Sequence, residues 1–199
     1  MYSTKTAISN PSESTGNWMP VGINENVTLT KCEVLKSPQG RTYIQFEFSN
    51  ELGQIAQMTE WKNEKNIWIK DDEELQIRDN QQFGRILQVL NSIAPNLPDV
   101  EFNNFVEMVN WVAEVANQYI PLQKKLRLKV IYDNKGYTKV SSYGIFVEPM
   151  DVKETQVRLF KRDLLERPIV ADKEPATDPF DIKNVTSDNL STGADDLPF

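Results

Sequence analysis

TYIQFEF, residues 42–48, alternates between apolar and polar positions over its whole length. Its even-numbered residues from Ile44 to Phe48 are apolar and fall on one face, while Tyr43, Gln45 and Glu47 fall on the other. This is the period of a strand with one buried face. Turn chemistry precedes it in Ser37-Pro38-Gln39-Gly40 and follows it in Glu51-Leu52-Gly53. The stretch therefore predicts the second strand of an antiparallel β structure.

The neighbouring stretches predict the first and third strands. A strand pattern begins near Val27, but its apolar positions shift by one residue between Leu29 and Cys32. Such a shift predicts a β-bulge that bends the strand, as the first strand of a small barrel requires. Gln54–Trp61 predicts the third strand, and Ile67–Ile69 is expected to extend the same edge.

The period changes to that of a helix in the middle of the chain. Residues 80–120 predict two helices, separated by Pro95 and Pro98 and ended by Pro121. The strand pattern returns at Leu126, and Asp133-Asn134-Lys135-Gly136 predicts a hairpin turn. Residues 137–148 are expected to pair back as the fifth strand, and residues 152–165 to form a C-terminal helix.

The predicted order is three strands, a helical insertion and two strands. The fold class is therefore mainly β with a helical insertion: a five-stranded OB-fold barrel with two helices between strands 3 and 4. Residues 1–20, rich in Ser, Thr and Asn, predict a flexible N-terminal arm, and residues 21–170 the folded domain. Residues 171–199 lack an apolar period and predict a disordered acidic tail.

Charge is distributed unevenly along the chain, whose net charge is −7. Residues 171–199 hold seven acids and two bases, whereas residues 122–162 hold ten bases and four acids. Residues 60–115 balance the basic segment with eleven acids and five bases. A pattern of this kind can place a basic groove on a nearly neutral body.

Composition excludes several classes of site. Histidine is absent, which removes histidine-based nucleophilic catalysis and histidine-ligated metals. The single cysteine, Cys32, excludes an internal disulfide and is expected in the core. No cofactor and no enzymatic activity are expected; magnesium-dependent nuclease chemistry at the acids Asp71–Glu74 is the remaining enzymatic alternative. The chain has neither a membrane-length apolar run nor a signal peptide, so we expect a cytoplasmic protein without membrane association.

The chain ends in Asp195-Asp196-Leu197-Pro198-Phe199. This pentapeptide resembles the acidic tip of bacterial single-stranded DNA-binding proteins (SSB), in which a run of aspartates precedes a terminal Ile-Pro-Phe. Here there are two aspartates, and Leu197 replaces the isoleucine. A terminal phenylalanine offers a ring and a carboxylate together, which a partner pocket with an apolar floor and a basic residue can hold.

The resemblance implies a protein that binds single-stranded DNA without sequence specificity during replication, recombination and repair. The tip would recruit partner proteins such as a polymerase, helicase, primase or nuclease. The setting would be the cytoplasm of a bacterial cell, and the long helical segment resembles phage-encoded relatives, which function in an infected cell. A homo-oligomer is compatible with this family, and the sequence leaves the oligomeric state open.

Single strands are held by positive charge and by flat apolar rings on which bases stack. By analogy with the family, strands 2 and 3 and the two hairpins should form the binding face. The candidate DNA contacts are Arg41, Tyr43, Trp61, Lys62, Trp68, Lys129, Tyr132, Lys135, Tyr137, Lys139 and Tyr143. Each ring could instead be a core residue and each lysine a solvated surface residue. Two other functions stay open: a strand-annealing or recombination-mediator protein, and a protein-interaction adaptor without a DNA role.

Overall fold

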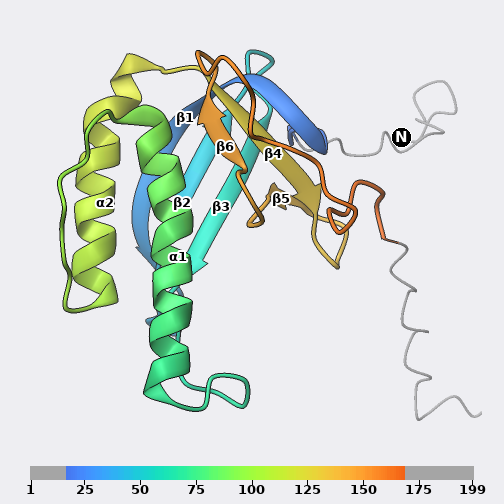
Figure 1. The fold of residues 1–199 in the computed structure, drawn as a ribbon. Coiled ribbons are helices and arrows are strands. Elements are labelled where there is room, and N and C mark those ends of the chain that lie inside the picture. The colour runs from blue at the N-terminus through green and yellow to red at the C-terminus, as the bar shows by residue number, and fades with distance from the viewer. Residues whose placement is uncertain (1–16, 169–199) are drawn as a thin grey trace, which may run out of the picture. The chain divides into compact units, whose positions relative to one another are not determined.

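An antiparallel sheet of six strands dominates the computed structural model, which describes residues 17–168 (Figure 1). The sheet order is β3-β2-β1-β4-β5, and β6 pairs with the other half of β4. The strands are β1 (Gly22–Lys36), β2 (Thr42–Ser49), β3 (Ile55–Trp61), β4 (Leu126–Tyr132), β5 (Thr138–Val140) and β6 (Val147–Pro149). The mainly β class is thus confirmed. The predicted tail, including its tip, lies outside the described residues.

The long strand β1 bends so that it serves two parts of the sheet. Its second half pairs with β2 and its first half with β4. The register shifts between Leu29 and Lys31 against β2, and between Asn24 and Val27 against β4, where Asn26 has a positive φ of 57°. The bulge predicted from the phase change near residue 30 is confirmed. Because each extra residue bends the strand, β1 can curl the sheet around the core.

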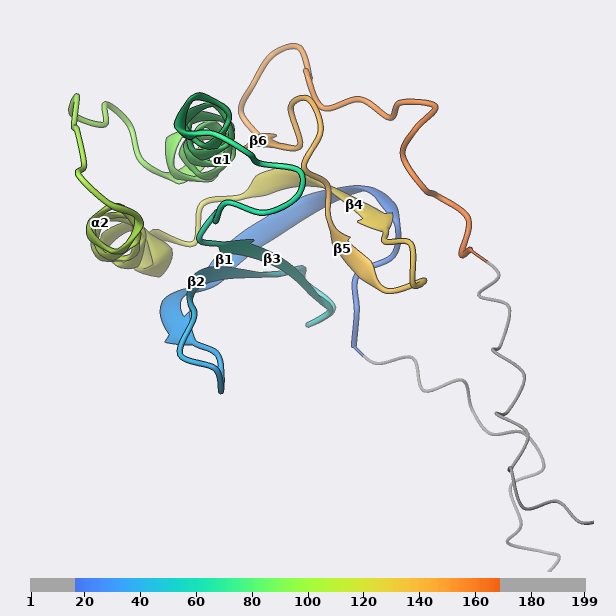
Figure 2. The same cartoon turned by 90° about the horizontal axis from the view of Figure 1, so that it is seen from below.

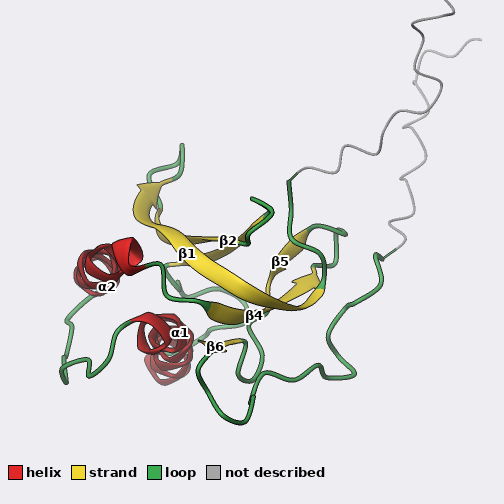
Figure 3. Cartoon of the chain, turned by 90° about the horizontal axis from the view of Figure 1, so that it is seen from above, coloured by secondary structure: helices red, strands yellow, loops and turns green. Residues whose placement is uncertain are grey.

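Two helices lie side by side on one side of the curved sheet (Figures 1 and 3). They are α1 (Asp72–Ile93) and α2 (Phe105–Tyr119), and a short 3-10 turn at Ile120–Leu122 follows α2. Helix α1 begins earlier than the expected start near residue 80. The Asp71 carboxylate caps it by accepting the Glu74 N–H at 2.7 Å. The acids of its first turn also face the positive end of the helix dipole.

Neither helix is long and apolar enough to cross a bilayer, within the part of the chain that the structure describes.

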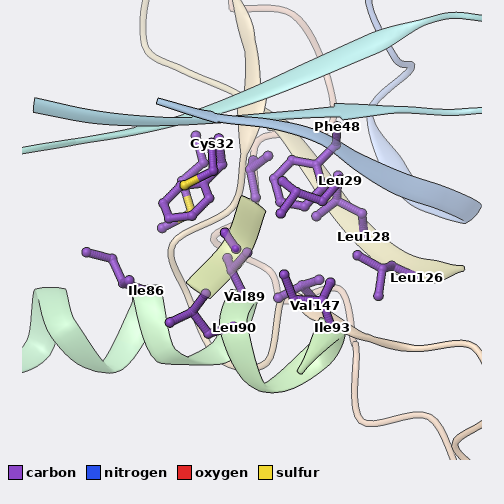
Figure 4. Close-up of a cluster of buried hydrophobic side chains, with 14 of the residues drawn as sticks. Leu29, Cys32, Phe48, Ile86, Val89, Leu90, Ile93, Leu126, Leu128 and Val147 are labelled. Carbon is purple, nitrogen blue, oxygen red and sulfur yellow. The ribbon is translucent and has the colours of Figure 1, made fainter. Parts of the chain in front are cut away.

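The core lies between the sheet and the helices (Figure 4). Phe46 and Phe48 of β2 are fully buried and belong to the same hydrophobic cluster as Ile86, Val89 and other residues of α1. Cys32 is 2% exposed, as expected for a core residue. Burial, assisted by the charge of Glu33, raises the pKa of the Cys32 thiol to about 12.

Three further segments differ from the sequence predictions. The expected fifth strand is broken into β5 and β6, because residues 141–146 form a loop between them, in which Gly144 has a φ of +63°. Ile67–Ile69 forms a turn and no strand. The predicted arm does not extend to residue 20: Met19 is buried, and its N–H donates to Ile55 O of β3 at 2.8 Å.

The predicted C-terminal helix over residues 152–165 is wrong. This segment is irregular, and of its expected inward residues Val157, Phe160 and Leu164 only Val157 is buried. Several of its polar groups bond to the sheet. Leu164 O accepts the Tyr132 N–H of β4, and the Gln156 N–H donates to Glu148 of β6. These tertiary bonds replace the helical ones that the periodicity favoured.

Candidate nucleic-acid interface

Strand alternation presents a polar and aromatic face on the outside of β2 and β3. The alternate residues Ile44, Phe46 and Phe48 are fully buried, so their neighbours point outward. The register sets three outward pairs across the two strands: Tyr43 opposite Trp61, Gln45 opposite Thr59, and Glu47 opposite Gln57.

The first of these pairs forms an aromatic surface. The ring centroids of Tyr43 and Trp61 are 4.3 Å apart with planes inclined by 31°, and Trp61 is 39% exposed. The Arg41 guanidinium lies 5.6 Å from the Trp61 ring centroid and 3.7 Å from Glu64. The structure therefore brings together three residues predicted to contact DNA. A base could stack on this surface while the guanidinium meets its phosphate.

The rest of the outer face is polar and close to neutral. The Gln45 amide lies within hydrogen-bonding distance of Gln57 and Thr59, and Gln57 donates to Glu47. Burial alone would raise the pKa of Glu47, but hydrogen bonds from Lys31, Gln57 and Thr30 outweigh it and lower the pKa. Positive charge for a phosphate chain must come from beyond this face.

That charge lies in a cleft of about 930 Å³ between β3, α1, β5 and the loop after β5. Figure 2 shows these elements with α1 seen nearly end-on. Gln57 and Thr59 line the cleft and also belong to the outer face, so the two surfaces are continuous. The cationic lining residues are Arg78, Arg85 and Lys139, and Tyr143 provides a ring.

The three cations differ in how strongly they are neutralised. Arg85 holds the buried carboxylate of Glu60 with two bonds of 2.6 and 2.8 Å. The bond to Glu60 raises the pKa of the Arg85 guanidinium in spite of its burial. Arg78 and Lys139 form no ion pair with any residue between 17 and 168. Within this part of the chain, no carboxylate neutralises either charge.

The edge of β3 adds backbone hydrogen-bonding groups to the cleft. The N–H and C=O of Ile55 bond to Asn17 and Met19, away from β2, and Trp61 O accepts the Gln82 amide. Because alternate residues of a strand direct these groups to the same edge, Gln57 and Thr59 direct theirs toward the cleft. Donors and acceptors of this kind suit the edges of unpaired bases.

The second hairpin borders the cleft. Tyr132, Lys135, Lys139 and Tyr143 line a smaller hollow of about 370 Å³, which shares Lys139 and Tyr143 with the cleft. The Arg162 guanidinium lies 4.2 Å from the centroid of the Tyr143 ring. Tyr137 is 67% exposed at the turn, where its N–H and that of Lys135 donate to Asp133. Four predicted contacts thus gather around one hollow, with Tyr137 on the turn beside it.

Two predicted residues lie near the end of β3. Lys62 directly follows Trp61 and is exposed. Trp68 is 75% exposed on a separate turn that Asn66 holds by accepting the N–H groups of Trp68 and Ile69. The acids of Asp71–Glu74 follow this turn. They belong to the start of α1, so the chain near Trp68 is more acidic than the cleft.

The assignment of Lys129 to the DNA surface is wrong. Its side chain is fully buried and bonded to Asp163, whose side chain is fully buried too. The sequence placed this lysine on a strand among other cations, but strand alternation alone did not reveal that residues 157–164 cover it.

Sequence reasoning missed Arg78, Arg85 and Arg162 as site residues. Arg78 falls in the first turns of α1, which the apolar period did not predict, and Arg162 falls in the segment taken for a helix. The available signal was the basic excess of residues 122–162, which includes Arg162.

Between residues 17 and 168, no three acidic or cysteine side chains lie close enough to hold a metal ion.

Comparison with known proteins gives no assignment by similarity. No protein-family model matches the chain, and no curated protein sequence matches it.

Proposed function

We propose that this protein binds single-stranded DNA without sequence specificity and recruits other proteins through its C-terminal tip. The observation that carries the proposal is the continuity between the Tyr43–Trp61 pair and the cationic cleft through Gln57 and Thr59. Stacking rings beside guanidinium and ammonium groups suit a flexible polyanion with exposed bases.

The proposed body is an OB-fold barrel that is open between β3 and β5. Three features support this fold: the sheet order, the bend of β1, and the proximity of β5 to β3 at the two ends of that order. In OB-folds, oligonucleotides lie across strands 2 and 3 between the two hairpin loops. In this chain those elements carry Arg41, Tyr43 and Trp61 on one side and Lys135, Lys139 and Tyr143 on the other.

In the proposed division of roles, the body holds the strand and the tip, Asp195–Phe199, binds replication or recombination proteins. The tip carries two acids and a terminal phenylalanine, which suit a basic pocket with an apolar floor. The setting would be a bacterial cell, including one infected by a phage. The proposal includes no catalytic step, and cleavage of a labelled oligonucleotide in the presence of magnesium would contradict it.

A titration of the full-length chain with oligo-dT tests the proposal. Trp61 lies in the site, so we expect its emission to be quenched on binding. The logarithm of affinity should fall linearly with the logarithm of salt concentration. Contacts from Arg41, Arg78, Lys139 and Arg162 predict a slope of about −3, from roughly −0.7 for each neutralised phosphate of a single strand.

Three controls accompany the titration. A duplex of equal length should bind much more weakly, and other base compositions should bind with similar affinity. If oligo-dT has no effect even at low salt, the chain is an adaptor without a DNA role. If it binds, a strand-pairing assay with complementary oligonucleotides distinguishes an annealing protein from one that only coats the strand.

A further inference from the structure

The side chain of Lys129 is fully buried below the rim of the cleft. Its ammonium group donates to Asp163 Oδ2 at 3.0 Å, to Tyr143 O at 3.0 Å and to Arg158 O at 3.2 Å. An ammonium group has three N–H donors, so these bonds use all of them. They join β4 to two separate segments of the chain: the loop that carries Tyr143 and the segment that carries Arg158 and Asp163.

Asp163 completes this arrangement from the segment of residues 157–164, which we call the strap. Its Oδ2 also accepts the Phe160 N–H at 2.8 Å, and the Asp163 N–H donates to Phe160 O at 2.9 Å. The carboxylate thus folds the strap into a tight turn around the buried ammonium group. Removing either charge would leave the other buried without its partner, which is strongly unfavourable.

The strap carries Arg162, and the loop after β5, which also bonds to Lys129, carries Tyr143. These two residues form the cation–π contact of 4.2 Å at the rim of the cleft. The segments also pack tightly beside the lysine: a Cβ at Gly144 would lie 2.8 Å from the Phe160 ring. In Figure 1 the orange chain after β6 passes β4 and β5 in this region.

We propose that Lys129 and Asp163 are positioning residues for the single-stranded DNA site, an inference that rests on the function proposed above. The buried pair fixes the strap against β4 and thereby holds Arg162 over Tyr143, where the guanidinium meets a phosphate and the ring meets a base. An apolar side chain in place of Lys129 would fill the same space, but it would not direct three bonds to two segments. Neither Lys129 nor Asp163 touches DNA.

The first test measures the strap without DNA. Asp163→Asn keeps the size of the side chain and removes its charge. Trypsin cleavage after Arg158, Lys161 and Arg162, followed by mass spectrometry, should become at least about tenfold faster than in the wild type. The control is Glu51→Gln, which breaks the exposed 3.2 Å pair with Lys125 and should leave cleavage of the strap unchanged.

The second test is a double-mutant cycle on oligo-dT affinity. Arg162→Gln should weaken binding several-fold and reduce the steepness of the salt dependence by roughly 0.7. Asp163→Asn should reproduce both effects. The double variant, with Arg162→Gln and Asp163→Asn together, should bind oligo-dT with the affinity of the weaker-binding single variant. Additive losses, or an unchanged affinity in Asp163→Asn, would overturn the positioning role.

A charge-free variant keeps the test decisive if Asp163→Asn does not fold. Lys129→Met combined with Asp163→Leu replaces the pair by apolar groups, a change that proteins often tolerate in the core. We expect a folded protein with a loosened strap and the DNA affinity of Arg162→Gln. Wild-type affinity in this variant would also overturn the inference. If the proposed function itself is wrong, the wild type will not bind oligo-dT, and this result is distinct from a loss of affinity in the variants.

Discussion

At the scale of single residues, the outward orientation of Tyr43 and Trp61 is a local consequence of strand alternation. What turns the two rings into a candidate stacking surface is the register of β2 and β3, which places them opposite each other. The first hairpin then places Arg41 beside the exposed indole. Three residues that are separate in the sequence thus form one surface.

We expect Trp61→Ala to weaken oligo-dT binding by about 1–3 kcal/mol, the usual contribution of one stacked base. Binding is measured by anisotropy of a labelled oligonucleotide, because the variant loses a fluorescent ring. Trp61 is 39% exposed, so the melting temperature should change little. Trp68→Ala is the matched comparison, since that ring lies on a separate turn near acids, and it should have a smaller effect. Equal losses in the two variants would contradict the assigned path of the strand.

At the scale of elements, α1 has two roles along its length. Its second half packs Ile86, Val89 and Leu90 against the sheet, while its exposed first half is held by the Asp71 cap. The helix contributes two arginines to the wall of the cleft, and between residues 17 and 168 a buried carboxylate neutralises Arg85 but not Arg78.

The two arginines should therefore respond differently to substitution. Arg78→Gln should reduce the steepness of the salt dependence by roughly 0.7 with an unchanged melting temperature. Arg85→Gln should lower the melting temperature clearly, because Glu60, only 7% exposed, would lose its charged partner. Salt-series titrations and thermal unfolding measure the two effects. A destabilised Arg78→Gln variant would show that this residue supports the fold rather than the cleft.

The junction of β4 and β6 gives the fold a dependence on pH. Burial alone would raise the pKa of Glu148, but hydrogen bonds from Thr155, the Gln156 N–H and Arg127 outweigh it and lower the pKa. A carboxyl with a lowered pKa in the folded state stabilises that state above its unfolded pKa, about 4.3. This stabilisation is lost as the pH falls through the lower, folded value.

We accordingly expect Glu148→Gln to be less stable than the wild type at pH 7 and to lose less stability in acid. Urea unfolding between pH 7 and pH 3 measures both differences. Glu154→Gln, at an exposed position six residues away, serves as the control. Its free energy of unfolding should change with pH as that of the wild type does. Parallel curves for Glu148→Gln and the wild type would exclude this carboxyl as a source of acid sensitivity.

At the scale of the whole molecule, charge is separated between two regions of the chain. The basic excess of residues 122–162 contributes Lys139 and Arg162 to the cleft and its rim, whereas residues 171–199 hold seven acids and two bases. If the body binds DNA as proposed, a segment of the same charge sign as the phosphates does not add to the binding.

Deleting Asp195–Phe199 should leave oligo-dT affinity unchanged or make it tighter, and should abolish the capture of partner proteins. Titration with oligo-dT and affinity capture from a bacterial extract measure the two effects. The control is a tip with the same composition in scrambled order. It should bind oligo-dT with the affinity of the wild type, but it should not capture partner proteins. Loss of DNA affinity on deletion would refute the division of roles between body and tip.

Local patterns predicted much of the sheet. The alternation of residues 42–48, the phase change in β1 and the turn at Asp133–Gly136 each depend on a few consecutive residues, and the structure confirms them. The outward positions of Tyr43 and Trp61 follow from the same short-range geometry. Such features could be predicted because strand period and turn preference are set within the segment itself.

The tertiary structure alone decided the remaining features. Residues 152–165 have the spacing of a helix, yet they form an irregular segment because β4 and β6 bond to them. Lys129 has the sequence context of a surface cation, yet it is buried because Asp163, 34 residues later, meets it in the fold. The cleft likewise needs β3, α1 and β5 together. The sequence alone determined the segments that form β1 to β4, whereas the break between β5 and β6, burial, ion pairing and the shape of the site depend on contacts between distant segments that no local pattern encodes.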